Sequence, residues 1–229
     1  MNVLLDLDGT LTDPRRGIVA CIQHALRSLG HDAPEESALL RYIGPPLQAA
    51  FRELLPLDSQ SDDGSGCERA IAAYRERFVA VGMFENSVYA GIPAALELLR
   101  DRGARLFVAT SKPKVYAERI LDHFELSRYF DEIYGSELDG RRADKGDLIA
   151  HVLSSSRLQR EHTAMVGDRH HDAVGALANG VRAVGVLWGY GSREELSNAG
   201  AETFLEAPSE LGRLAFNAAL PAAQGATAW

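Results

Sequence analysis

The chain has 229 residues and a formal net charge of −8, from 24 Lys or Arg and 32 Asp or Glu. Hydrophobic residues make up 46% and charged residues 24%, close to the globular average, which excludes disorder of the whole chain. The acidic balance argues against a nucleic-acid polymer as partner, and no apolar run reaches the roughly 18 residues that span a membrane. With no signal-peptide pattern at the N-terminus, we expect a cytoplasmic protein without membrane partners.

The first predicted element is a buried strand at 3–6, an apolar run that ends in acid and then glycine. Residues 17–84 then carry apolar residues at helical spacing, and no pattern there indicates a strand. The helices predicted in this block span 18–30, 38–43, 47–55 and 67–82, with a polar loop at 59–66.

After Gly91 the pattern alternates between strand and helix. Strands are predicted at 105–110, 131–136, 163–168, 182–189 and 202–206. Helices are predicted at 93–103, 115–126, 146–156, 172–180 and 208–220, followed by a loose tail at 221–229. Such alternation with apolar strands is typical of a parallel sheet that is covered on both faces. We predict an α/β fold with a doubly wound parallel sheet, built from 1–14 and 87–229, into which an all-helical domain of 15–86 is inserted.

Polar residues follow the predicted strands, at the edge where doubly wound sheets bind ligands. They are Asp6 and Asp8 after the first strand, Thr110, Ser111 and Lys112 after the second, and Asp168 and Asp172 after the fourth. Lys145 stands just before the helix that leads into the fourth strand. We therefore expect these side chains to converge on one rim.

The acids at this rim predict a divalent cation. Asp6 and Asp8 are two residues apart, so their side chains begin on the same side of an extended segment. Together with Asp168 and Asp172 they would repel one another without a counter-charge. Mg²⁺ suits such a site, because it takes carboxylates and also binds phosphate oxygens. The competing interpretation, solvated turn and helix-cap acids, does not explain the hydroxyl and lysine at the same rim.

Four motifs resemble those of the haloacid dehalogenase superfamily. The segment 6–13, DLDGTLTD, resembles the first motif, and 167–172, GDRHHD, the fourth. Thr110 and Lys145 are similar to the second and third. The helical insertion resembles the cap of phosphoglycolate phosphatase-like members. Segments such as YIGPPL and GVLWGYGSREEL are similar to a bacterial subgroup described as 5′-nucleotidases or phosphoglycolate phosphatases.

The resemblance implies a Mg²⁺-dependent phosphomonoesterase that acts through an aspartyl-phosphate. Asp6 would be the nucleophile, and Asp8 would be the general acid and base and would bind the metal through its backbone carbonyl. Thr110, Ser111 and Lys145 would hold the phosphoryl group. Asp168 would bind Mg²⁺ directly, and Asp172 would do so through water or would orient Lys145.

The source of the active-site cation stays open. Lys112 and Lys114 also lie near the rim, and the segment 141–147 lacks the Lys-Pro pair that is common in the family. Lys145 is preferred for its place before the fourth strand. His170 and His171 are interpreted as loop residues rather than zinc ligands, because no third His or Cys is near.

The helical insertion is expected to close over the core and to select the leaving group. Arg41, Gly44 and Pro45 are the candidate substrate contacts, because an equivalent loop of related caps reaches the active site. The substrate would be a small phosphorylated metabolite: a nucleotide, phosphoglycolate or a sugar phosphate. The protein would be a monomer or homodimer. A sugar phosphomutase remains an alternative, and so does a non-catalytic regulatory protein, which usually lacks one of the acids or the lysine.

Overall fold

The computed structural model describes residues 1–55 and 65–215. Within them, one sheet has six strands in the order β5-β4-β1-β6-β7-β8, all paired in parallel. The strands are β1 (Asn2–Leu5), β4 (Arg105–Pro113), β5 (Glu132–Ser136), β6 (Thr163–Gly167), β7 (Arg182–Val186) and β8 (Thr203–Leu205). The predicted α/β fold with a doubly wound parallel sheet is confirmed.

The strand order reverses at β1. From this central strand the sheet grows through β4 and β5 on one side and through β6, β7 and β8 on the other. In register, Leu5 lies beside Val108 of β4 and Val166 of β6. The loops that follow these three strands therefore meet at one edge, which is the ligand-binding position of a doubly wound fold.

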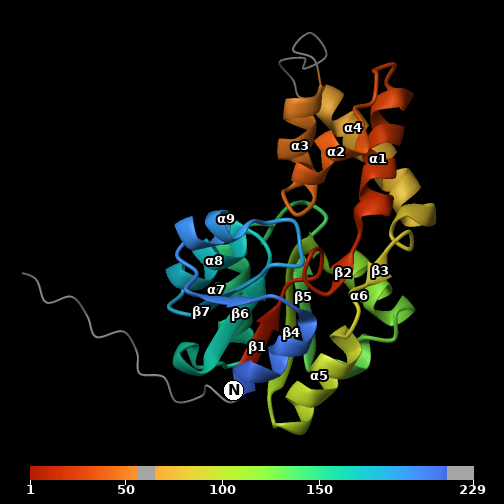
Figure 1. Ribbon diagram of the computed structural model, residues 1–229. Helices are drawn as coiled ribbons and strands as arrows, with labels where there is room; N and C mark the ends of the chain where they lie inside the picture. Colours follow the sequence, from red (N-terminus) through yellow and green to blue (C-terminus); the bar gives the residue numbers. More distant parts are fainter. Residues whose placement is uncertain (56–64, 216–229) are drawn as a thin grey trace, which may run out of the picture.

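Helices cover both faces of the sheet (Figure 1). Because side chains alternate along a strand, Val3 and Leu5 pack into one apolar cluster and Leu4 into another. The first cluster includes residues of α5 (Ile92–Asp101) and α6 (Lys114–His123). The second includes residues of α7 (Lys145–Ser155), α8 (His170–Ala178) and α9 (Arg193–Asn198). Burial on both sides explains why β1 reads as a continuous apolar run.

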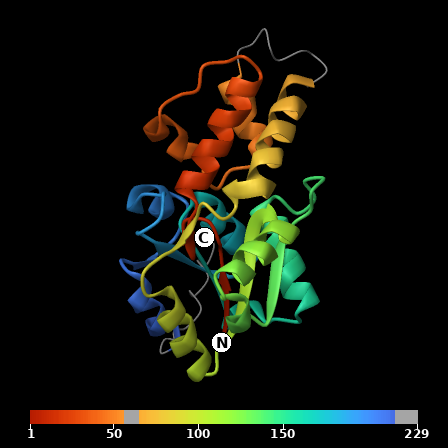
Figure 2. The ribbon, with the colours of Figure 1, turned by 90° about the vertical axis from the view of Figure 1, so that its right-hand side faces the viewer.

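The segment between β1 and α5 forms a separate group of helices beyond the carboxyl edge of the sheet (Figures 1 and 2). Its helices are α1 (Arg15–Ser28), α2 (Glu36–Leu39), α3 (Leu47–Leu54) and α4 (Ser65–Arg77), and a π-helix, Phe78–Gly82, continues α4. Gly17 and Gly82 allow α1 and the π-helix to touch, since a Cβ on Gly17 would lie 2.0 Å from the Gly82 carbonyl oxygen. We interpret 15–86 as a cap over the site and call it the cap below.

Some elements differ from the prediction. Two short strands, β2 (Thr12–Asp13) and β3 (Ser87–Val88), pair antiparallel where the chain enters and leaves the cap. Two-residue strands carry no detectable alternation, so only the tertiary pairing reveals them. The last predicted helix is a 3₁₀ helix, Pro208–Ala215, in the described part, and the rest of 208–220 lies outside the described residues.

Other predicted features fall partly or wholly outside the described residues. The polar loop predicted at 59–66 is described only from Ser65, where α4 begins, and the tail at 221–229 is not described. Short 3₁₀ turns complete the elements, at Leu40–Tyr42, Ser127–Tyr129 and Arg160–His162. None of the helices in the described part of the chain has the length and apolar character needed to cross a bilayer.

Candidate active site

Asp6 and Asp8 leave the sheet where β1 ends. The Asp6 N–H still donates to the Val166 carbonyl at 2.9 Å, so the first acid is held in the sheet register. The chain then turns at Gly9, whose φ of +83° is a left-handed conformation that favours glycine. A Cβ on Gly9 would lie 2.2 Å from Oδ2 of Asp168, so this glycine also lets the acid after β6 approach.

Lys145, at the first turn of α7, joins three parts of the site. Its Nζ lies 2.9 Å from Asp6 Oδ1 and 2.8 Å from Asp172 Oδ1, and it donates to the Ala109 carbonyl at 2.9 Å. Burial disfavours the charged amine, but Asp172 and Asp6 outweigh it and raise the pKa of Lys145 above its ordinary value. The lysine is therefore a fixed cation that contacts the proposed nucleophile.

Asp168 and Asp172 come from the β6–α8 loop and the first turn of α8. Asp168 Oδ2 accepts a hydrogen bond from the Tyr190 N–H at 2.8 Å, whereas the buried Oδ1 has no partner among the described residues. Burial raises the pKa of Asp168 well above its usual range, and the neighbouring Asp172 and Asp6 carboxylates add to the rise. Burial also raises the pKa of Asp172 to about 6, against the opposing effect of Lys145. The cationic side chains near Asp168 and Asp172 therefore do not fully compensate the negative charge of these two carboxylates.

The residues fit a divalent cation. Carboxylate oxygens of Asp6, Asp168 and Asp172 lie within 4.8 Å of one another. Of the four buried carboxylates, those of Asp6, Asp8 and Asp172 pair with the ammonium groups of Lys145 and Lys112, and four acids against two lysines leave a formal excess of two negative charges. An all-oxygen donor set with one unpartnered carboxylate oxygen suits Mg²⁺. The Asp8 carboxylate is not in this group of three, so only its backbone carbonyl remains a candidate ligand.

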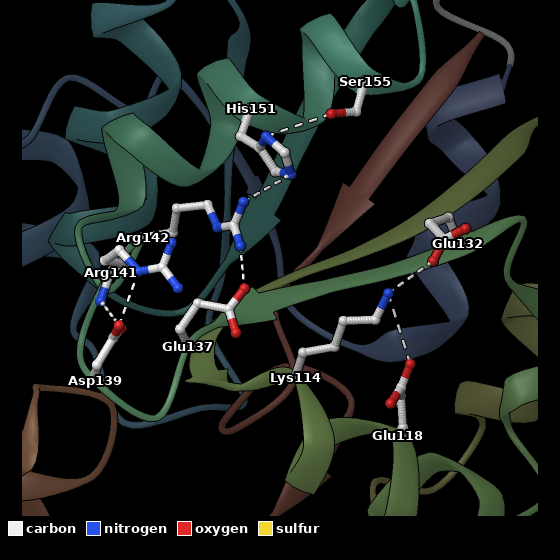
Figure 3. A network of polar contacts seen from close by, with 9 residues as sticks. All are labelled: Lys114, Glu118, Glu132, Glu137, Asp139, Arg141, Arg142, His151 and Ser155. Carbon is white, nitrogen blue, oxygen red and sulfur yellow. Dashed lines mark hydrogen bonds and ion pairs between the residues drawn. The ribbon is translucent and has the colours of Figure 1, made fainter.

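The structure places the three candidate lysines in different surroundings. Lys112 pairs with Asp8, with Nζ 2.6 Å from Oδ2, rather than with Asp6. Lys114 points to Glu132 and Glu118, at 3.0 and 3.7 Å, on the outside of the sheet edge (Figure 3). Lys145 is therefore the lysine that pairs with Asp6, whereas Lys112 pairs with Asp8, the candidate general acid and base.

Above the carboxylates lies a cavity of about 480 Å³ between the core and the cap. Its core side includes Thr110, Ser111, Lys112, Tyr116, Ser136, Arg169 and His171. Its cap side includes Tyr42, Gly44, Pro45, Pro46, Leu47, Tyr74, Arg75 and Phe78. Thr110 and Ser111 thus lie at the site with the acids, and the Gly44–Pro46 turn reaches it from the cap.

Arg41, expected to contact substrate, does not line this cavity, so its role as a substrate contact stays a prediction. Its side chain is 67% exposed and forms an ion pair with Glu53 on the cap surface. Arg41 lies on a short 3₁₀ turn, and the next residue, Tyr42, is the one that lines the cavity. The register within a three-residue turn is not visible in the sequence pattern.

Arg169, in the fourth motif, is a contact between core and cap that the sequence reading missed. Its Nη1 donates to the Ile43 carbonyl at 2.8 Å, directly before the Gly44–Pro46 turn, and its Nε donates to Glu195 at 2.9 Å. Gly44 has a φ of +103°, and a Cβ there would lie 3.5 Å from the arginine stem. The position of Arg169 between Asp168 and the histidines was the only feature of the sequence that pointed to this residue.

Two histidines, His170 and His171, follow Arg169 in the chain and belong to the core. His170 donates its N–H to Glu195 and places Nδ1 2.9 Å from the same carboxylate. Burial and the neighbouring His170 lower the pKa of His171. Both histidines lie in the first turn of α8, which begins at His170, so the expectation that they are loop residues is wrong. In the described ranges the metal-competent cluster at this edge contains carboxylates only.

The segment after β7 supports Asp168 from the other side, a role that the sequence did not predict. Tyr190 donates its N–H to Asp168 and its hydroxyl to Asp13 of β2. Trp188 Nε1 donates to the Thr10 carbonyl at 3.0 Å. Gly189 lies so close that a Cβ would be 2.4 Å from the Cβ of Asp168.

Comparison with known proteins agrees with this geometry. A Pseudomonas aeruginosa protein named 5′-nucleotidase is 50% identical over 195 residues, which cover 85% of this chain and 86% of that protein. A Mycobacterium tuberculosis protein named tyrosine-protein kinase is 44% identical over 189 residues, 82% of this chain and 62% of that protein. The solved structure of a predicted phosphatase from Clostridium acetobutylicum has a TM-score of 0.87 and 42% identity, covering 94% of this chain and 98% of that one.

All four motifs lie within a single family match. Residues 3–186, more than half of the chain, match the family described as haloacid dehalogenase-like hydrolase. The chain belongs to the haloacid dehalogenase-like hydrolase family.

Proposed function

We propose that the protein is a Mg²⁺-dependent phosphomonoesterase that hydrolyses a small phosphorylated metabolite through an aspartyl-phosphate. The observation that carries this proposal is the placement of Asp6. This carboxylate is held by Lys145, lies within 4.8 Å of Asp168 and Asp172 oxygens, and lines the cavity under the cap. An ionised carboxylate needs no base to attack phosphorus.

The residues divide the chemistry between two steps. In the first, a carboxylate oxygen of Asp6 bonds to phosphorus, the bond to the leaving oxygen breaks, and Asp8 gives that oxygen a proton. In the second, Asp8 takes a proton from the water that attacks phosphorus, and phosphate leaves Asp6. Burial raises the pKa of Asp8, against Lys112, which favours a carboxyl group that can carry a proton. Thr110 and Lys145 would hold the phosphoryl oxygens.

Asp6, Asp168 and Asp172, with the Asp8 carbonyl, would hold Mg²⁺. The cation would neutralise the excess negative charge of the carboxylates and of the phosphoryl group. The protein's own contribution is to keep these acids buried and to fix Asp168 through the Tyr190 N–H.

Among the candidate substrates, we propose a nucleoside 5′-monophosphate. A cavity of about 480 Å³ far exceeds the two-carbon leaving group of phosphoglycolate. Its cap wall includes Tyr42, Tyr74 and Phe78, and apolar aromatic walls suit a nucleobase. Arg41, a cap arginine among the candidate substrate contacts, pairs with Glu53 outside the cavity. The name of the 50% identical relative agrees with this choice.

Phosphate release in the presence of Mg²⁺ tests the proposal. Wild type and Asp6→Asn, which is nearly isosteric but a poor nucleophile, are compared on nucleoside 5′-monophosphates, phosphoglycolate and a hexose phosphate. We expect the highest kcat/KM on a nucleotide and no turnover by a folded Asp6→Asn protein. Full phosphate release by this variant would refute the mechanism, and a higher kcat/KM on phosphoglycolate would refute the substrate class.

The similarity to a protein named tyrosine-protein kinase favours a second candidate, transfer of the phosphoryl group to a tyrosine hydroxyl. Incubation with γ-labelled ATP and a tyrosine peptide separates the two. Label in inorganic phosphate supports the hydrolase, whereas label in the peptide supports transfer. Conversion between two hexose phosphates without phosphate release would instead indicate a mutase.

A further inference from the structure

A second buried lysine lies in the site but does not touch the nucleophile. Lys112 places Nζ 2.6 Å from Asp8 Oδ2, and its side chain is only 8% exposed. The other oxygen of Asp8, Oδ1, is buried and has no hydrogen-bond partner among the described residues. The lysine therefore occupies one carboxylate oxygen and leaves the other one available to a ligand.

The sheet is built to bring Lys112 to this place. The pairing of β4 with β5 shifts between Thr110 and Pro113, and such an irregularity re-aims the side chains that follow it. Gly135 of β5 allows the shift, because a Cβ there would lie 2.6 Å from the Lys112 carbonyl oxygen. Thr110 Oγ1 accepts from the Lys112 N–H at 3.3 Å, which links the lysine to the residue proposed to bind phosphate.

The cap covers the same ammonium group. Nζ of Lys112 lies 4.8 Å from the ring centre of Phe78, the first residue of the π-helix. Tyr74 stacks on Phe78 at 5.5 Å, and Tyr116 of the core meets it edge-on at 5.4 Å. A cation over an aromatic face is attracted more strongly when water is excluded, and π-helical turns are frequent at functional sites. Lys112 is thus held between an acid of the core and an aromatic ring of the cap.

We propose that Lys112 is the positioning residue of the proton-transfer step. It holds Asp8 through Oδ2 so that Oδ1 faces the leaving oxygen, and Phe78 keeps the ammonium in place. The inference rests on the proposed function, in which Asp8 protonates the leaving group. The proton passes from Asp8 Oδ1 to the leaving oxygen, and Lys112 keeps its own protons. Its importance should therefore grow with the need of the leaving group for a proton.

Two phosphate esters that differ in leaving group test this inference. An alkyl ester without a nucleobase, such as ribose 5-phosphate, has a leaving group that departs poorly without a proton, whereas the leaving group of p-nitrophenyl phosphate departs well without one. We expect Lys112→Met, which keeps the stem and loses the charge, to lower kcat/KM on the alkyl ester by about 10- to 100-fold. On the aryl ester the loss should stay within about threefold. Lys112→Arg should recover part of the alkyl activity.

Two further variants separate positioning from a general loss of structure. Phe78→Leu keeps the apolar contact but removes the aromatic face, and it should show the same leaving-group dependence to a smaller extent. Lys114→Met, at the first residue of α6, removes an amine that pairs with Glu132 and Glu118 outside the site, and it should leave kcat/KM on both esters unchanged. The thermal midpoint Tm of each variant shows that it is folded, and Lys112→Arg and Phe78→Leu carry the test if Lys112→Met does not fold.

The outcomes of this experiment are distinct. Equal losses on both esters, or no loss on either, would overturn the role of Lys112. Asp8→Asn tests the proposed function itself. If this variant lowers kcat/KM equally on both esters, Asp8 is not the general acid, whatever the result for Lys112. If both single variants discriminate against the alkyl ester, Lys112→Met in the Asp8→Asn background should add no further discrimination, and an additional loss would also overturn the inference.

Discussion

A single substitution at Arg169 removes the contact between the core and the cap turn. The arginine donates from Nη1 to the Ile43 carbonyl at 2.8 Å and from Nε to Glu195 at 2.9 Å, and its side chain is 14% exposed. Arg169→Met keeps most of the aliphatic stem beside Gly44 and removes both donors. We expect the Gly44–Pro46 turn to lose its anchor over the cavity while the carboxylates below it stay in place.

The magnitude follows from the charge and burial of the contact. A hydrogen bond from a charged donor contributes about 1.5–3 kcal/mol, and little exposure means little screening by water. Glu195 keeps two contacts with His170, so its carboxylate is not left alone in the core. If the contact stabilises only the closed position of the turn, its loss lowers kcat/KM for a substrate that touches the turn by about 10- to 100-fold.

The assay compares kcat/KM on a nucleoside 5′-monophosphate and on p-nitrophenyl phosphate at saturating Mg²⁺. Arg169→Met should lose much more on the nucleotide than on the aryl ester, which needs less of the cap wall. Arg41→Met is the matched control, because its ion pair with Glu53 is exposed and lies outside the cavity. Exposed pairs contribute about 0–1 kcal/mol, so we expect kcat/KM to stay within about twofold.

Two results would refute this reasoning. An unchanged nucleotide kcat/KM in Arg169→Met would show that the turn needs no anchor. An equal loss on both esters, together with a higher Mg²⁺ concentration at half-maximal activity, would show that Arg169 acts through its neighbour Asp168 and not through the cap.

Three other predictions concern the metal site and its surroundings. EDTA should abolish activity, Mg²⁺ should restore it, and Ca²⁺ should restore it poorly, because the larger ion allows a carboxylate to bind through both oxygens; full activity in EDTA contradicts the metal assignment. Gly189→Ala should lower activity at limiting Mg²⁺ because its Cβ would lie 2.4 Å from that of Asp168, whereas Gly30→Ala, with nothing within 4 Å, should keep kcat/KM even if Tm falls. Burial raises the pKa of Glu195, but hydrogen bonds from His170 and Arg169 outweigh burial and lower this pKa from 4.5 to about 2. The ionised Glu195 therefore stabilises the fold fully above pH 4.5, and this stabilisation is lost as the pH falls toward 2. The difference in Tm between wild type and Glu195→Gln should therefore be constant above that pH and shrink below it, and a difference that grows in acid would contradict this sign.

The sequence by itself determined the fold class and the elements that carry the carboxylates. Apolar runs followed by acid or glycine are local signals, and burial on both faces makes each strand of a parallel sheet such a run. Asp6 and Asp168 could be placed at one edge because the carboxyl ends of parallel strands share it. Lys145 could be placed beside them because it opens a helix at the same edge.

Only the tertiary structure decided how the remaining side chains divide the work. Lys112 lies on Asp8, Arg169 reaches Ile43 across 126 positions of the chain, and the Tyr190 N–H supports Asp168. The exposed position of Arg41 depends on the register of a three-residue turn. Contacts between residues far apart in sequence are selected by packing and by the satisfaction of buried polar groups. Packing and the satisfaction of buried polar groups leave no periodic pattern along the chain, so these contacts can be identified only from the tertiary structure.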